Sequence, residues 1–192
     1  MTGKLVVITG LDGSGTSSIG DKLCALDPAG ISFKTPSSPF EECRSQFDGK
    51  LREESPAAHY LFYLASVVYA SEQIQRHLKT HNVYCVRYLI DTVVSHRVAG
   101  LAVDLEYETP HYSIRKPDMT LFLNINEGTR QARISARGKS ELDMVLDNDL
   151  VRNSFLKEFA RFSSDYHVID NSSQSVDDAV LKAAKLLPWL KR

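Results

Sequence analysis

Residues 10–18, with the sequence GLDGSGTSS, have the composition and spacing of a loop that binds phosphate. Gly10 and Gly15 are separated by four residues, and Ser17 stands at the place of the hydroxyl residue in such loops. An apolar segment at 4–9 precedes the loop and is expected to form a buried strand, with a helix after the loop. Backbone amides at the start of that helix would bind phosphate oxygens. The segment therefore predicts a nucleotide site.

The loop departs from this pattern at one position that matters for catalysis. Thr16 stands where a P-loop carries the lysine that reaches the outer phosphates, so a short neutral hydroxyl replaces a charge. Ser17 would contribute its hydroxyl to Mg²⁺, and ATP and Mg²⁺ are the expected ligands. The residues predicted to bind ATP are Gly10, Gly13, Ser14, Gly15, Thr16, Ser17 and Ser18.

Apolar segments and helical patterns alternate along the chain, as in a parallel sheet with helices on both faces. The expected strands are 4–9, 31–33, 83–86, 119–125 and 167–169. The expected helices follow the phosphate loop, run over about 57–79, 127–137 and 150–162, and begin after Ser175. This pattern predicts a three-layer α/β/α fold with a five-stranded parallel sheet, in a single domain of residues 1–192. Ligands should bind at the carboxyl ends of the strands.

Composition narrows the expected partners. The 192 residues include 23 basic and 24 acidic side chains, so no overall field would attract nucleic acid or a membrane surface. No apolar run approaches the roughly 20 residues that span a bilayer, and the early first strand leaves no room for a signal peptide. Three widely spaced cysteines, Cys24, Cys43 and Cys85, are typical of reduced thiols. We expect a cytoplasmic protein that acts on a small molecule.

Several segments, in order along nearly the whole chain, resemble the thymidylate kinase family of P-loop nucleoside monophosphate kinases. The loop at 10–17 matches the family pattern G-x-D-G-S-G-K-T/S except at Thr16, and KPDMTLFL at 116–123 matches its K-P-D-L-T-x-x-L strand. Weaker matches are KTPSSP at 34–39, YLFYLASV at 60–67, VRY at 86–88 and the arginine-bearing helix at 130–138. The resemblance implies a fold of the P-loop nucleoside triphosphate hydrolase type.

The resemblance also implies roles for residues around the loop. Asp12 is similar to the family acid near the acceptor sugar and phosphate, and Tyr63 to its base-stacking aromatic residue. Arg87 follows a strand, where a guanidinium can clamp an acceptor phosphate with two hydrogen bonds. The predicted catalytic residues are Asp12, Arg87, Arg133 and Arg137, and the predicted substrate-binding residues are Lys34, Tyr63, Arg87 and Asp91.

Three departures from the family pattern fall at functional positions. Thr16 removes the loop lysine, Val86 removes an acid that supports the magnesium or phosphate site, and Val67 removes an arginine used against the pyrimidine ring. Asp91 is a candidate to replace the lost acid. A lid-like segment near 133–148 would bring Arg133 and Arg137 over the phosphates, and these cations would partly replace the missing charge.

Three functions remain open from the sequence. The first is transfer of the terminal phosphoryl group of ATP to a nucleoside monophosphate, dTMP or a related small acceptor. The second is a catalytically degenerate protein that binds nucleotide without turnover, which the loss of two charged residues favours. The third is a nucleoside or specialised-metabolite kinase of the same fold. The resemblance also implies a homodimer formed through helices such as 57–79.

Overall fold

A parallel five-stranded sheet forms the centre of the molecule, in a computed structural model that describes residues 2–138, 141–172 and 175–191. The strands are β1 (Leu5–Gly10), β2 (Gly30–Lys34), β3 (Asn82–Val86), β4 (Met119–Asn124) and β5 (His167–Asp170). Their order is β2-β3-β1-β4-β5, and every neighbouring pair is parallel. Ile8 pairs with Val86 on one side and with Leu121 on the other, so β1, β3 and β4 end at the same edge.

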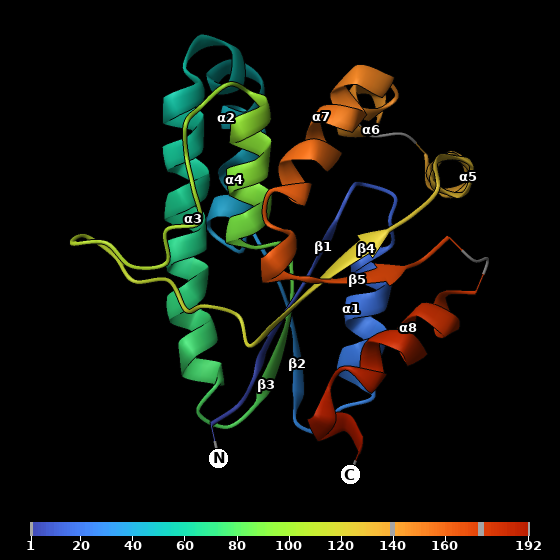
Figure 1. The fold of residues 1–192 in the computed structure, drawn as a ribbon. Helices are drawn as coiled ribbons and strands as arrows, with labels where there is room; N and C mark the ends of the chain where they lie inside the picture. The colour runs from blue at the N-terminus through green and yellow to red at the C-terminus, as the bar shows by residue number, and fades with distance from the viewer. Residues whose placement is uncertain (1, 139–140, 173–174, 192) are drawn as a thin grey trace.

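Helices cover both faces of the sheet (Figure 1). They are α1 (Thr16–Ala25), α2 (Phe40–Glu54), α3 (Pro56–His77), α4 (Leu89–Val98), α5 (Glu127–Arg137), α6 (Glu141–Leu146), α7 (Asp149–Ala160) and α8 (Val176–Lys185). Side chains alternate along β1: Leu5 and Val7 enter the core formed with α3, α4 and α7, whereas Val6 and Ile8 enter the core formed with α1 and α8. These two cores confirm the predicted three layers.

The strands and helices predicted from apolar periodicity are confirmed, with ends that differ by one or two residues. Three further helices were not predicted: α2, α4 and the short α6. The first two escaped for opposite reasons. Helix α2 is polar and has no buried residue, and it packs on α3 through rings such as Phe47 and Phe62, whose centroids are 4.8 Å apart. Helix α4 is buried on most of its surface, so it lacks the one-sided apolar pattern of an ordinary surface helix.

The carboxyl ends of the strands form the functional end of the molecule. Figure 1 shows α2, α5 and α6 gathered at this end, with both chain termini at the opposite end. The phosphate loop leaves β1 here and leads directly into α1. None of the helices in the described ranges is long and apolar enough to cross a membrane.

Candidate active site

The glycines of the phosphate loop adopt backbone conformations that other residues avoid. Gly13 and Gly15 have φ values of 84° and 93°, in the left-handed region. Space is limited as well: a Cβ on Gly13 would lie 2.9 Å from Cγ of Arg130, and one on Gly15 would lie 2.8 Å from Nδ2 of Asn171. The loop therefore ends at the amino terminus of α1 in a tight conformation suited to phosphate binding.

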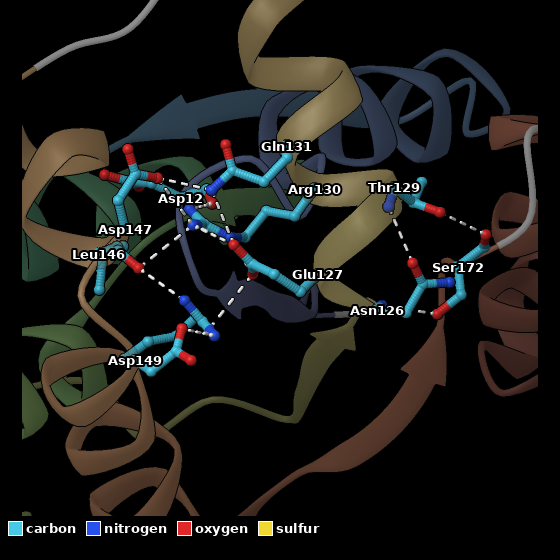
Figure 2. Close-up of polar contacts among 11 residues, drawn as sticks. Asp12, Asn126, Glu127, Thr129, Arg130, Gln131, Leu146, Asp147, Asp149 and Ser172 are labelled. Carbon is cyan, nitrogen blue, oxygen red and sulfur yellow. Dashed lines mark hydrogen bonds and ion pairs between the residues drawn. The ribbon is translucent and has the colours of Figure 1, made fainter.

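Two buried side chains hold this loop, and neither was predicted. Arg130 forms a bidentate ion pair with Glu127, with N–O distances of 2.7 and 2.8 Å, and its Nη1 donates to the carbonyl of Asp12 at 3.4 Å (Figure 2). Asn171 donates from Nδ2 to the carbonyl of Ser14 at 2.6 Å. Asn171 directly follows β5, and its place at a strand end was a readable signal. The resemblance placed Arg130 at the start of the arginine-bearing helix, but nothing in the sequence indicated that it is buried and contacts the loop.

Arg87 lies between two carboxylates just after β3. Its Nη2 is 2.5 Å from Oδ1 of Asp12, its Nη1 is 2.7 Å from Oδ1 of Asp91, and Nη1 also donates to the carbonyl of Gly10. Thr9 donates its hydroxyl to the same Asp91 oxygen at 2.6 Å. Burial opposes the charged form of Arg87, but Asp91 and Asp12 outweigh it and raise the pKa of Arg87. The guanidinium therefore stays protonated.

The backbone of Arg87 is strained. Its φ of 67° is in the left-handed region, which costs a non-glycine residue on the order of 1–3 kcal/mol. The ion pairs with Asp12 and Asp91 hold the residue in this conformation. These contacts and the bond to Gly10 use three of the five guanidinium N–H groups, so within the described structure two remain for a ligand. Strain held in this way is typical of functional sites.

A cavity of about 1080 Å³ extends from the phosphate loop to α2, α3 and α4. All but one of the predicted site residues line it: Gly10, Asp12, Gly13, Gly15, Thr16, Ser17, Ser18, Lys34, Tyr63, Arg87, Asp91, Arg133 and Arg137. The exception is Ser14, which is buried beneath the loop. The structure thus brings together residues that lie far apart in the sequence.

Arg133 places a cation beside the phosphate loop. Its Nη1 lies 3.5 Å from the position that a Cβ on Gly15 would occupy. Burial lowers the pKa of Arg133. Within the lid-like segment, α5 ends at Arg137 and α6 covers Glu141–Leu146, while residues 139 and 140 lie outside the described ranges.

The three departures from the family pattern have different surroundings. Thr16 is 8% exposed and lines the cavity. Val86 also lines the cavity, and its Cγ2 would be 2.8 Å from a Cβ on Gly20 of α1, so little room surrounds it. Val67 is 1% exposed and belongs to the core, whereas Tyr63 and Ser66 face the cavity from the same helix. An arginine at position 67 would therefore enter the core.

The far end of the cavity contains a polar cluster that was not predicted. Asp48, His59 and His96 line it, from α2, α3 and α4 respectively. Tyr63 donates its hydroxyl to Oδ1 of Asp48 at 2.6 Å, so the predicted base-stacking residue is tied to this cluster. No sequence pattern could have predicted that these three residues meet, because they lie on three separate helices. Among the described residues, no group of three His, Cys, Asp or Glu could hold a metal ion.

Comparison with known proteins agrees with this geometry. The sequence model of the family "Thymidylate kinase" matches residues 8–182. The chain belongs to the thymidylate kinase family. A thymidylate kinase from Brachyspira hyodysenteriae is 29% identical to it over 207 residues, and the alignment covers 98% of each chain. This thymidylate kinase family member is therefore a phosphotransferase of the thymidylate kinase type.

Solved structures share the fold. The thymidylate kinase of Candida albicans has a TM-score of 0.79 at 18% identity, covering 99% of this chain and 93% of that chain. The thymidylate kinase of Ehrlichia chaffeensis has a TM-score of 0.68 at 17% identity, covering 97% and 100%. The predicted P-loop fold class is confirmed.

Proposed function

We propose that this thymidylate kinase family member transfers the terminal phosphoryl group of ATP to a nucleoside monophosphate, with dTMP as the first candidate. One observation carries the proposal: the phosphate loop, Arg133 and the Asp12–Arg87–Asp91 cluster line a single cavity. Phosphoryl transfer depends on positioning two substrates in line and on neutralising the phosphate charge. A shared cavity with cations at two of its walls supplies both requirements.

ATP would bind through the loop. The glycine backbone and the first turn of α1 would hold phosphate oxygens, and Ser17, exposed on that turn, would hold Mg²⁺ through its hydroxyl. The chemistry fits, since Mg²⁺ prefers oxygen ligands, and the ion would supply charge neutralisation at the phosphates. Arg133, beside Gly15, supports the proposal because it offers a protein cation where the loop has Thr16.

The acceptor would bind between Arg87 and Tyr63. The remaining N–H groups of Arg87 would clamp its phosphate, while Asp12 and Asp91 keep the guanidinium in place. The ring of Tyr63 would form a wall for the base, because the bond from its hydroxyl to Asp48 fixes the side chain.

The test is ADP release from ATP and Mg²⁺ in the presence of each nucleoside monophosphate in turn. We expect release that depends on the acceptor. Arg133→Ala should lower turnover by about 10²-fold, since one positioned charge or donor at a reacting group is worth about that much. Arg76→Ala, exposed at the far end of α3, is the control and should retain wild-type turnover.

A nucleotide-binding protein without turnover is the second candidate, because Thr16 stands in place of the loop lysine. Calorimetry with ATP and ADP separates the two functions. Tight ATP binding without ADP release for any acceptor would support the second candidate and contradict the first.

We also propose a cytoplasmic homodimer that contacts its copy through α3. In this helix Leu61 is 60% exposed. It borders a shallow apolar groove lined by Leu61, Leu64, Ala65, Val68, Tyr69, Glu72 and Tyr112.

The proposed cytoplasmic location rests on the cysteines. All three are free thiols, which supports a reducing compartment.

A further inference from the structure

Four groups form a continuous polar chain at the far end of the cavity. Nδ1 of His96 contacts the carbonyl of Thr92 at 2.7 Å, and Nε2 of His96 contacts Nδ1 of His59 at 2.8 Å. Nε2 of His59 then contacts Oδ1 of Asp48 at 3.1 Å. Both rings are about 3% exposed, so water cannot easily replace any of these contacts.

The number of hydrogens in this chain is one too few when both rings are neutral. Three contacts need three hydrogens, and the two ends, a carbonyl and a carboxylate, can only accept. Two neutral imidazoles supply two N–H groups. In any neutral arrangement two lone pairs therefore face each other across at least one of the three contacts. The complete chain needs one additional proton.

That proton belongs to the rings, because Asp48 is ionised. Burial alone would raise the pKa of the Asp48 carboxyl, but hydrogen bonds from Tyr63 and Arg44 outweigh this effect and lower it. The bond from Nε of Arg44 to Oδ2 is 2.7 Å long. The complete chain is consequently an imidazolium shared by His59 and His96 against the carboxylate of Asp48.

The free protein holds this proton weakly. Burial lowers the pKa of His96 to about 4 and also lowers the pKa of His59, against the opposing effect of Asp48. The titratable and charged groups around the two rings are Asp48, Arg44 and Arg52 from α2 and Tyr60 and Tyr63 from α3. Since the rings are in contact, they titrate as a pair, below the ordinary histidine value.

We propose that acceptor binding in this cavity is coupled to the uptake of one proton by the His59–His96 pair. The inference rests on the proposed function only in placing an acceptor against Tyr63 and Asp48. An acceptor that packs on this wall needs Asp48 and Tyr63 in fixed positions, and only the protonated pair makes all three contacts of the chain that runs from the Thr92 carbonyl to Asp48. An anionic nucleoside monophosphate also favours a cation nearby. His59 and His96 are thus positioning residues.

The sign of the pH dependence follows from linkage. Binding raises the pKa of the pair, so the acceptor affinity is greatest below the pKa of the free pair. As the pH rises above that value the affinity falls by about tenfold per pH unit, until the pKa of the bound pair is reached. Above that point the slope disappears.

Calorimetry of dTMP binding tests the coupling. The binding enthalpy is measured in buffers that differ in ionisation enthalpy, at steps between about pH 5 and pH 8, and gives the number of protons taken up. His96→Gln is the matched variant, because its amide can donate to Nδ1 of His59 and complete the chain without a proton. The difference between wild type and His96→Gln also removes protons exchanged by the phosphate of dTMP. His111→Gln, an exposed site outside the cavity, is the control.

We expect the wild type and His111→Gln to take up close to one proton more than His96→Gln at the maximum. Equal uptake in all three would overturn the proposal. A second measurement uses wild type alone: ¹⁵N shifts of the ring nitrogens should report an additional proton on the pair when dTMP binds. Neutral rings in both states would overturn the proposal even if His96→Gln does not fold. Proton-coupled binding without ADP release would support this inference and contradict the proposed kinase activity, whereas ADP release without proton coupling would do the reverse.

Discussion

In the proposed function, Thr16 and Arg133 determine how positive charge is supplied at the phosphate loop. The side chain of Thr16 lines the cavity, and Arg133 reaches the neighbouring Gly15 from α5. Two positions on different elements can therefore serve the same phosphate group. We therefore propose that Arg133 takes the place of the usual loop lysine as the source of positive charge.

We predict that Thr16→Lys restores turnover to an Arg133→Ala protein by about 10²-fold, because it returns a charge to the transferring group. Thr16→Gln has a similar length without the charge and should restore nothing. The measurement is kcat from ADP release in Arg133→Ala and in the two double variants that add Thr16→Lys or Thr16→Gln to it. A double variant no faster than Arg133→Ala would remove position 16 from charge neutralisation.

Val67 gives a second prediction at the same scale. Because this side chain is 1% exposed in the core, Val67→Arg should lower the free energy of unfolding by about 3–5 kcal/mol, the cost of burying an unpaired charge. It should not increase dTMP affinity. Val67→Ile is the control. Urea unfolding and dTMP calorimetry measure the two quantities, and a stable variant with tighter dTMP binding would place position 67 in the cavity instead.

At the scale of elements, α5 connects the phosphate loop to the segment that follows it. Arg130 contacts Glu127 within its own helix, the carbonyl of Asp12 in the loop and the carbonyl of Leu146 at the end of α6, the last at 3.2 Å (Figure 2). Arg152 of α7 also contacts the Leu146 carbonyl, at 3.1 Å. One buried guanidinium thus joins three segments.

We predict that Arg130→Ala lowers the free energy of unfolding by about 1–3 kcal/mol, because it removes the buried hydrogen-bond donor of the loop and opens space beside Gly13, while Glu127 keeps its ion pair with Arg152. ATP affinity should fall as well, since the loop loses this support. Arg137→Ala changes the exposed end of the same helix and should stay within about 0.5 kcal/mol of wild type. Urea unfolding curves of the wild type, Arg130→Ala and Arg137→Ala measure the free energy of unfolding. Equal stability of all three proteins would show that the contacts of Arg130 with the loop and with Glu127 do not stabilise the fold.

At the scale of the whole molecule, the proposed homodimer depends on an exposed apolar stripe of α3. We predict that Leu61→Arg shifts the protein from dimer to monomer in sedimentation equilibrium, because a charge cannot be desolvated at the centre of an apolar contact. Leu181→Arg is the matched control, since this leucine of α8 is also 60% exposed. A wild-type protein that stays monomeric at high concentration, or a Leu61→Arg dimer, would contradict the proposal.

The sequence by itself determined the features that are local. The phosphate loop is a contiguous segment with a recognisable glycine spacing. Residues 10–18 were therefore predicted correctly as a loop that leaves a strand and closes onto a helix, with residues 11–15 between β1 and α1. Alternating apolar segments likewise fixed the three layers. Helices α2, α4 and α6 were not predicted: α2 is almost wholly polar, α4 is almost wholly buried, and α6 has only six residues.

Only the tertiary structure decided which distant residues meet. The parallel register of β1 and β3 brings Asp12 to Arg87, and this contact is a property of the sheet rather than of either segment. The orientation of α3 puts Tyr63 in the cavity and Val67 in the core, four residues apart. Three helices pack together at one end of the sheet and bring Asp48, His59 and His96 into contact. Hydrogen bonds between separate helices depend on how the helices pack, so no periodic pattern in the sequence predicts them.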